Sequence, residues 1–257
     1  MSLYSELASV LAKPCLGLVL LISACTSQEI VTGKPIPVQN DRDSINQVAK
    51  NDMDRMADIE MRENIQSLRI LMTKLYKRNP QQLQKSIAYY NTQGVKTSSA
   101  EDMVEWVFTQ NPTWQFASIN QVKDTEALFL AFNDDYTGDR VLPLIIGLQT
   151  MLIKAHGGRS EHFLTDSIQP QSIYNVARNI EIAAWKLGTA RDALGNLYLI
   201  SNQITDQSGG VQNLSFEREF GKMIGRTDIY AITLAEKSQR LISRVVQSVT
   251  TLLFLPF

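Results

Sequence analysis

The feature that most constrains the fold is a helical spacing of apolar residues, which recur every three or four positions over long stretches of the chain. The longest stretch covers residues 43–77, where Asp43 or Ser44 can cap the helix. Its stripe consists of Ile45, Ala49, Met53, Ala57, Met61, Ile65, Leu68, Met72 and Leu75. At 1.5 Å per residue this helix would be about 50 Å long. Such a stripe must pack against other helices, which predicts a bundle.

Helical patterns also follow later in the chain. Pro80 suits the first turn of a helix, and Ser98-Ser99-Ala100-Glu101 is a capping-box pattern before another. Asp139 can cap a helix that is apolar on nearly all sides, so we expect that helix at the centre of the bundle. The further helices are expected over residues 80–94, 99–111, 124–132, 139–156, 170–187 and 215–252.

The expected fold is therefore mainly all-α: a multi-helix bundle whose two long terminal helices pack as an antiparallel pair. The only strand signal lies at 190–200 and allows at most one short β-hairpin. The last helix carries two apolar stripes, one of which includes Ile229 and Ile232. Two stripes indicate either deep burial or an exposed face for a partner.

Composition excludes several classes of protein. The chain is 44% hydrophobic and 20% charged, which is typical of a folded globular protein rather than a disordered one. It has 25 basic and 26 acidic residues, for a net charge of −1. A nucleic-acid partner is therefore not expected, because binding phosphates requires an excess of clustered Lys and Arg.

The first 24 residues are typical of a secretory signal. Residues 15–24 form an apolar run after Lys13, and this run is too short to cross a bilayer. It ends in Ile22-Ser23-Ala24-Cys25, which resembles the lipobox of bacterial lipoproteins. The resemblance implies cleavage after Ala24 and a covalent lipid on Cys25, with no other cofactor. The competing interpretation is an ordinary cleaved signal whose boundary happens to carry a cysteine.

The lipobox resemblance also implies a location. Thr26 follows the cysteine where an Asp would retain such lipoproteins in the inner membrane. This implies a palmitate-type anchor at the periplasmic face of the outer membrane of a Gram-negative bacterium. Two or more acyl chains hold a protein stably at a bilayer. In addition, residues 132–202 resemble an uncharacterised group of proteobacterial lipoproteins, a resemblance that implies no activity.

The chain is expected to contain three parts. Residues 1–24 are the signal peptide, and residues 25–42 are the acylated N-terminus and a flexible tether, because Gly33, Pro35 and Pro37 interrupt any periodicity. Residues 43–257 form a single helical domain. Its last residues, 251–257, are apolar, and they either pack against the body or contact a partner or the bilayer.

Candidates for catalysis or metal binding are few. His156 and His162, with Glu161, are the weak metal candidates, but their spacing does not place both rings on one helix face. The simpler interpretation is a solvated loop after a helix C-terminus, where the helix dipole favours a histidine. Serine catalysis lacks a Gly-x-Ser-x-Gly elbow, and the Asn133–Gly138 loop lacks the glutamate that calcium requires. No catalytic residue is therefore predicted.

The best candidate binding surface is a polar stripe on helix 170–187. Arg178 can pair with Glu181 one turn away, and Trp185 offers a ring to Arg178. The candidate set is Asp166, Tyr174, Asn175, Arg178, Glu181 and Trp185. The competing interpretation is an amphipathic surface helix with an ordinary salt bridge.

These features favour a lipid-anchored, periplasm-facing envelope protein that acts through protein contacts, in a structural or assembly role. Its partners would be the membrane, through the anchor, and another protein or a second copy of itself. The alternative is a small-ligand-binding or hydrolytic domain that uses the polar cluster between residues 156 and 192. A closed bundle with an exposed apolar groove would favour the first hypothesis, and a deep pocket with converging polar groups would favour the second.

Overall fold

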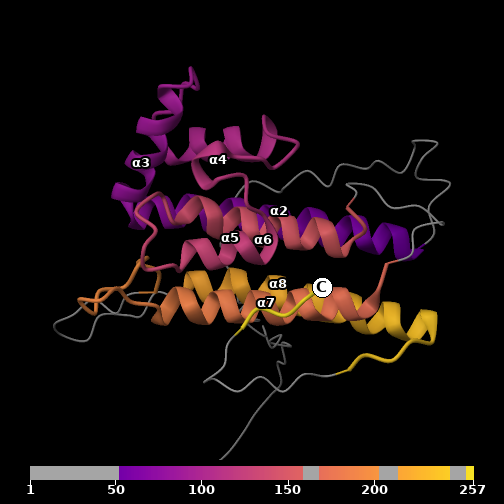
Figure 1. Cartoon of the computed structure of the whole chain (residues 1–257). Coiled ribbons are helices and arrows are strands. Elements are labelled where there is room, and N and C mark those ends of the chain that lie inside the picture. Colours follow the sequence, from indigo (N-terminus) through magenta and orange to yellow (C-terminus); the bar gives the residue numbers. More distant parts are fainter. Residues whose placement is uncertain (1–51, 159–167, 203–213, 244–252) are drawn as a thin grey trace, which may run out of the picture. The chain divides into compact units, whose positions relative to one another are not determined.

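The computed structural model describes residues 52–158, 168–202, 214–243 and 253–257 (Figure 1). They belong to one compact unit, Asp41–Phe257. In these ranges the chain forms seven α-helices and no strand, so the prediction of a helical bundle is confirmed. The helices are α2 (Asp52–Arg78), α3 (Pro80–Asn91), α4 (Ala100–Thr109), α5 (Asp124–Ala131), α6 (Val141–Ala155), α7 (Pro170–Thr189) and α8 (Ser215–Ser238). The expected signal peptide, Cys25 and the tether lie outside the described residues.

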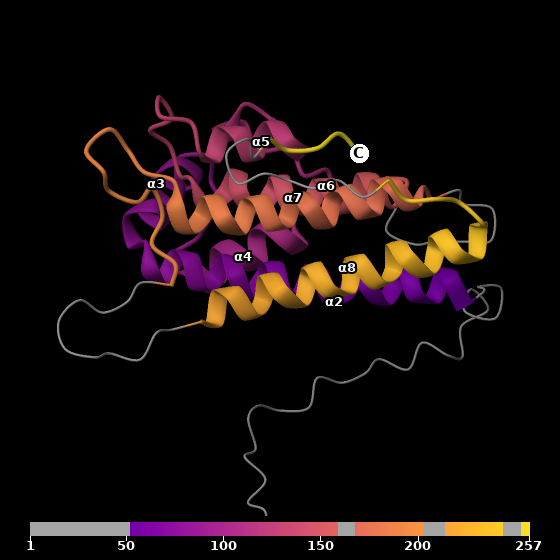
Figure 2. The same ribbon diagram turned by 90° about the horizontal axis from the view of Figure 1, so that it is seen from below.

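Four helices form a closed ring at the centre of this unit. α2 packs against α6 and α8, and α7 packs against the same two helices. Neighbours in the ring run in opposite directions (Figure 2). For α2 and α8, Lys74 lies over the ring of Phe216, and Thr227 bonds Glu60, so later residues of one helix meet earlier residues of the other. The two long helices are therefore the antiparallel pair that the sequence predicts.

α6 is the buried helix of the bundle. Every residue from Val141 to Leu152 is buried, because α2, α5 and α7 surround the helix. α5 comes unusually close at Gly147, where a Cβ atom would lie 2.7 Å from the Leu128 side chain and 2.8 Å from the Asp124 carbonyl oxygen. No helix in the described ranges is both long and apolar enough to cross a membrane.

The last helix is shorter than predicted. α8 ends at Ser238, and Gln239 adopts a left-handed conformation with φ of 53°. The amide of Arg240 then bonds the carbonyl oxygen of Ala235, a common way to end a helix. Beyond this point, Gln171 of α7 bonds the amide of Ser243 at 2.8 Å and the carbonyl oxygen of Ser243 at 3.2 Å. These bonds hold the segment away from the axis of α8. The prediction that the helix continues through residues 239–243 is therefore wrong, and 244–252 lie outside the described residues.

Two smaller expectations are corrected in detail. The capping box before α4 is shifted by one residue, because Ser99 is the N-cap and exchanges hydrogen bonds with Asp102. At 190–200 there are no strands, only an isolated antiparallel bridge between Arg191 and Leu197 around a turn.

Asp139, the expected cap of α6, lies one residue before the actual N-cap residue, Arg140, and its side chain connects the start of the helix to α2 and α3. Its Oδ1 accepts from the amide of Val141 at 2.9 Å. Its Oδ2 accepts from the hydroxyls of Tyr76 in α2 and Ser86 in α3, both at 2.6 Å. Burial raises the pKa of Asp139 from 3.8 to about 6, because the loss of hydration outweighs these hydrogen bonds.

This raised pKa predicts a pH dependence of stability. Between about pH 4 and pH 6, the folded chain holds a proton that the unfolded chain releases. The contribution of Asp139 to the free energy of unfolding is therefore full below about pH 4 and is lost as the pH rises through about 6. A rise of about two pKa units corresponds to about 3 kcal/mol. We expect Asp139→Asn to remove this loss.

The measurement is urea unfolding of both chains at pH 4.5 and pH 7. Relative to the Asp139→Asn variant, the unsubstituted chain should lose stability between these pH values. Asp135→Asn serves as the control, because the Asp135 side chain is exposed in a loop. If the Asp139→Asn chain keeps the same pH dependence as the unsubstituted chain, the buried carboxyl does not titrate in this range.

Candidate functional site

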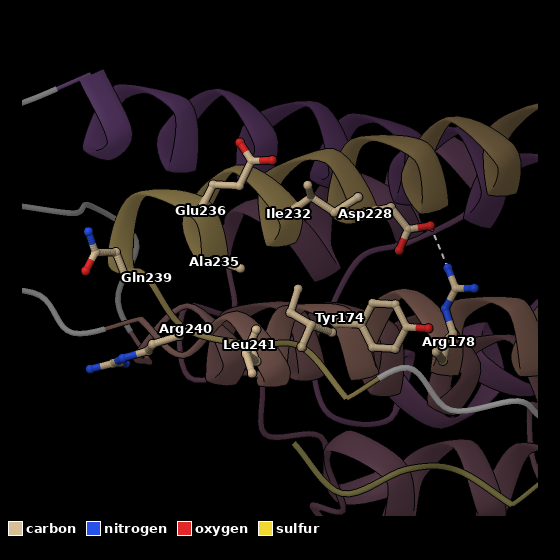
Figure 3. A pocket seen from close by; sticks show the side chains of 10 residues that line it. Tyr174, Arg178, Asp228, Ile232, Ala235, Glu236, Gln239, Arg240 and Leu241 are labelled. Carbon is tan, nitrogen blue, oxygen red and sulfur yellow. Dashed lines mark hydrogen bonds and ion pairs between the residues drawn. The ribbon is translucent and has the colours of Figure 1, made fainter.

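A groove between α7 and α8 contains the centre of the predicted polar stripe. It has a volume of about 610 Å³, within the range of ligand and peptide pockets. Tyr174 and Arg178 line it from α7, Asp228 and Ile232 line it from α8, and the segment after α8 closes it with Leu241 (Figure 3). Two of the residues singled out from the sequence therefore lie in a pocket.

Arg178 organises the polar end of this groove. Its Nη2 lies 2.5 Å from Oδ2 of Asp228, and its Nη1 lies 3.0 Å from Oε1 of Glu181. The guanidinium also lies over the ring of Tyr174, 5.0 Å from its centre. The predicted pair with Glu181 is present, but the ring that Arg178 covers is Tyr174, where we expected Trp185. Tyr174 occupies this position because it lies one turn before Arg178 on the same face.

Some polar atoms at this end still have hydrogen-bonding capacity. Nε of Arg178 and Oδ1 of Asp228 are buried without a hydrogen-bond partner among the described residues. Partial burial also raises the pKa of Glu181, against the opposing effect of Arg178. A donor and an acceptor of this kind can pair with the C=O and N–H of a peptide group.

The other side of the groove is apolar and open to solvent. Ile232 is 42% exposed and Leu241 is 98% exposed, and Ile229 lies further along α8 with 58% of its surface exposed. Ala235 and Ile242 complete the apolar lining. Of the two interpretations of the second α8 stripe, the structure supports the exposed face, at least for Ile229 and Ile232.

The remaining residues of the predicted surface do not join this groove. Asn175 faces the C-terminal segment, where its Nδ2 bonds the carbonyl oxygen of Pro256 at 2.7 Å. Trp185 is 43% exposed, two turns beyond Arg178, and does not line the pocket. Asp166 lies outside the described residues, as do Glu161 and His162.

His156 is buried, so the expectation of a solvated histidine is wrong. It caps the end of α6 with no exposed surface, because α2 and α8 cover it. Its Nε2 lies 2.9 Å from Oε2 of Glu60 in α2, and its Nδ1 lies 2.8 Å from the carbonyl oxygen of Leu152. The ring stacks on Tyr230 of α8 with an angle of 6° between the planes. A carbonyl oxygen only accepts, so Nδ1 donates the hydrogen bond to Leu152.

Glu60 and its neighbours form a buried polar cluster that sequence analysis missed. The other carboxyl oxygen of Glu60 accepts from Thr227 at 2.7 Å and from Asn64 at 2.5 Å. Arg226 then bonds Asn64 at 3.0 Å and Ser67 at 2.7 Å. Glu60, Asn64 and Ser67 are spaced by four and three residues, so they form a polar stripe beside the apolar one. That spacing was a detectable signal, but it could not reveal the partner helix.

The structure does not bring His156 to the groove of Arg178, because His156 lies within the bundle and does not line that pocket. Among the described residues, no group of three or more His, Cys, Asp or Glu side chains is placed to hold a metal ion. Comparison of the chain with protein families, curated proteins and solved structures found no match.

The Glu60–His156 pair predicts a large effect on stability. Replacing either residue by Ala leaves its partner buried without this contact, which typically costs about 1–3 kcal/mol. Because the two side chains contact each other, the double variant should lose much less than the sum of the two single losses. Urea unfolding of the single and double variants measures this coupling.

Lys77→Ala is the control for that measurement. Lys77 pairs with Glu101 at 2.5 Å, but both side chains are more than half exposed. Solvent screens such a pair, so its loss should change the free energy of unfolding far less. Additive losses at Glu60 and His156 would show that the two residues do not act as a pair.

Proposed function

We propose that this chain is a lipid-anchored envelope protein that faces the periplasm from the outer membrane and acts through protein contacts at the groove between α7 and α8. The anchor is the covalent lipid on Cys25, attached through the tether of residues 25–42. The partner is a protein segment that places an apolar side chain against Ile232 and Leu241 and a peptide group beside Arg178 and Asp228.

The observation that carries this proposal is the exposed apolar side of the groove. Ile229, Ile232 and Leu241 keep large parts of their surface in water although the helices beside them bury a complete core. Exposed apolar side chains that cluster beside a pocket are typical of interaction sites, because covering them releases water. The Arg178–Asp228 pair at one end would give orientation to a partner, as polar groups do at the edge of an interface.

The N-terminal sequence supports the location. The apolar run of residues 15–24 and the Ile22-Ser23-Ala24-Cys25 motif resemble a lipoprotein signal. The alternative of a small-ligand-binding domain is favoured by the pocket volume alone.

The anchor is tested by Cys25→Ser in cells that are fed labelled palmitate. We expect the unsubstituted chain to carry the label and to fractionate with the outer membrane, because the acyl chains provide the membrane affinity. The variant should lose both the label and the membrane association. Cys15→Ser is the matched control and should change neither, since that residue leaves with the signal peptide. An unlabelled chain would contradict the anchor.

The groove is tested separately by a photo-crosslinking amino acid in living cells. At position 232 it should form a defined adduct with one partner, and at the exposed position 84 on α3 it should not. Asp228→Ala in the same chain should reduce the adduct several-fold, because it removes the polar end of the groove. An adduct that persists unchanged in that variant, or equal crosslinking from position 84, would contradict the proposed surface.

A further inference from the structure

A row of carboxamide side chains on α7 binds the backbone of the C-terminal part of the chain. Gln171, Asn175 and Asn179 follow each other at intervals of four residues, so they lie on one face of the helix. Gln171 bonds Ser243, and the two asparagines bond the segment 253–257. Figure 2 shows this last segment, in yellow, beside α5 and α7. The expectation that the C-terminal residues pack against the body is confirmed for 253–257.

Asn179 holds the segment by both atoms of its amide. Its Oδ1 accepts from the amide of Leu255 at 2.6 Å, and its Nδ2 donates to the carbonyl oxygen of the same residue at 2.8 Å. Asn175 adds a bond of 2.7 Å to the next carbonyl, that of Pro256. The asparagines thus bind an extended backbone in the way that a neighbouring strand would. These bonds involve main-chain atoms only, so they do not depend on the side chains of the occupant.

Two aromatic side chains, three positions apart, provide the selectivity. Phe254 is buried and packs edge-to-face on Phe129 of α5, with 5.2 Å between the ring centres. Phe257 lies under the ammonium group of Lys154, which is 4.9 Å from its ring centre. Phe129 is itself 48% exposed even with the segment in place. It therefore acts as a surface platform for an aromatic residue rather than as part of the core.

The asparagine at the centre of this site depends on the segment for most of its side-chain hydrogen bonds. Asn179 has no exposed surface, and the one other bond of its side chain among the described residues is a 3.6 Å contact to the sulfur of Met151. The two asparagines thus favour a peptide backbone as the occupant of this face of α7.

We propose that this face of α7, together with Phe129 of α5, is a binding site for extended peptide segments that carry two aromatic residues three positions apart. The proposed ligand is the 253–257 segment of a second copy of this chain. A second copy carries the one segment that the structure shows to fit. The same contacts form whether the segment comes from its own chain or from another, which is the condition for exchange between copies. This site lies on a different side of α7 from the groove proposed above and does not depend on it.

The chain's own segment competes with that of a second copy. A covalently connected segment has an effective concentration in the millimolar range, so it occupies the site at low protein concentration. Exchange is therefore revealed most clearly when one chain offers only the site and the other offers only the segment. The competition also predicts that an added peptide binds the unsubstituted chain more weakly than a chain whose own segment cannot anchor.

The experiment uses two variants of the full chain. The acceptor, Phe254→Ala with Phe257→Ala, keeps the site but loses the aromatic anchors of its segment. The donor, Asn175→Leu with Asn179→Leu, keeps the segment but loses the bonds of its site. In sedimentation experiments, we expect neither variant alone to form a dimer through this contact. The mixture of the two variants should form a one-to-one dimer. At the same concentration, the unsubstituted chain should contain at least about tenfold less dimer.

A synthetic peptide, Leu-Phe-Leu-Pro-Phe, tests the site itself. It should bind the acceptor at least about tenfold more tightly than the unsubstituted chain, and a control peptide with both Phe replaced by Ala should not bind. If neither the peptide nor the donor binds the acceptor, the proposal is overturned. If the peptide binds the acceptor but no dimer forms with the donor, the second copy as its source is overturned.

A measurement on the unsubstituted chain covers the case in which a variant fails to fold. The amide of Leu255 is held by Asn179, so hydrogen exchange in the 253–257 segment should be slow. Saturating peptide should displace the segment and speed this exchange several-fold, while exchange in α6 stays unchanged. An unaltered rate in the segment under saturating peptide would show that it is a permanent part of the fold, and the proposal would fail.

Discussion

The burial of α6 between α2, α5 and α7 is the interaction on which the rest of the structure depends. A helix that is apolar on all sides gains its stability only when other helices cover every side, so the ring of α2, α6, α7 and α8 and the covering helix α5 follow from it. Close approach matters as much as apolar character. Gly147 leaves room for α5, and a side chain there would meet the backbone of Asp124.

Polar groups at both ends of α6 then select one alignment along α2. Asp139 before the helix bonds Tyr76, and His156 after it contacts Glu60. Apolar contacts have no direction and tolerate a shift along the helix axis, but a shift of one turn would separate Asp139 from Tyr76 and His156 from Glu60. The order of these contacts along α2, with the start of α6 at residue 76 and its end at residue 60, also makes the two helices antiparallel.

α7 presents different chemistry on each of its sides. One side enters the core, a second carries Tyr174 and Arg178 into the groove beside α8, and a third carries Asn175 and Asn179 to the C-terminal segment. A helix in a ring of four has two flanks at the surface, and each flank here meets a different part of the chain. The polar stripe that the sequence shows as one candidate surface is therefore two surfaces.

Local sequence patterns were enough to predict the helical class, the approximate position of most helices and the antiparallel terminal pair, because helical spacing and capping depend on neighbours within a few residues. They also singled out Tyr174 and Arg178 for the same reason. Three contacts could be found only from the packed helices: His156 meets Glu60, Asp228 pairs with Arg178, and Asn179 holds Leu255. These contacts join residues 50 to 96 positions apart. Local spacing carries no information about which distant helix faces a given side chain, and packing of the whole bundle supplies it.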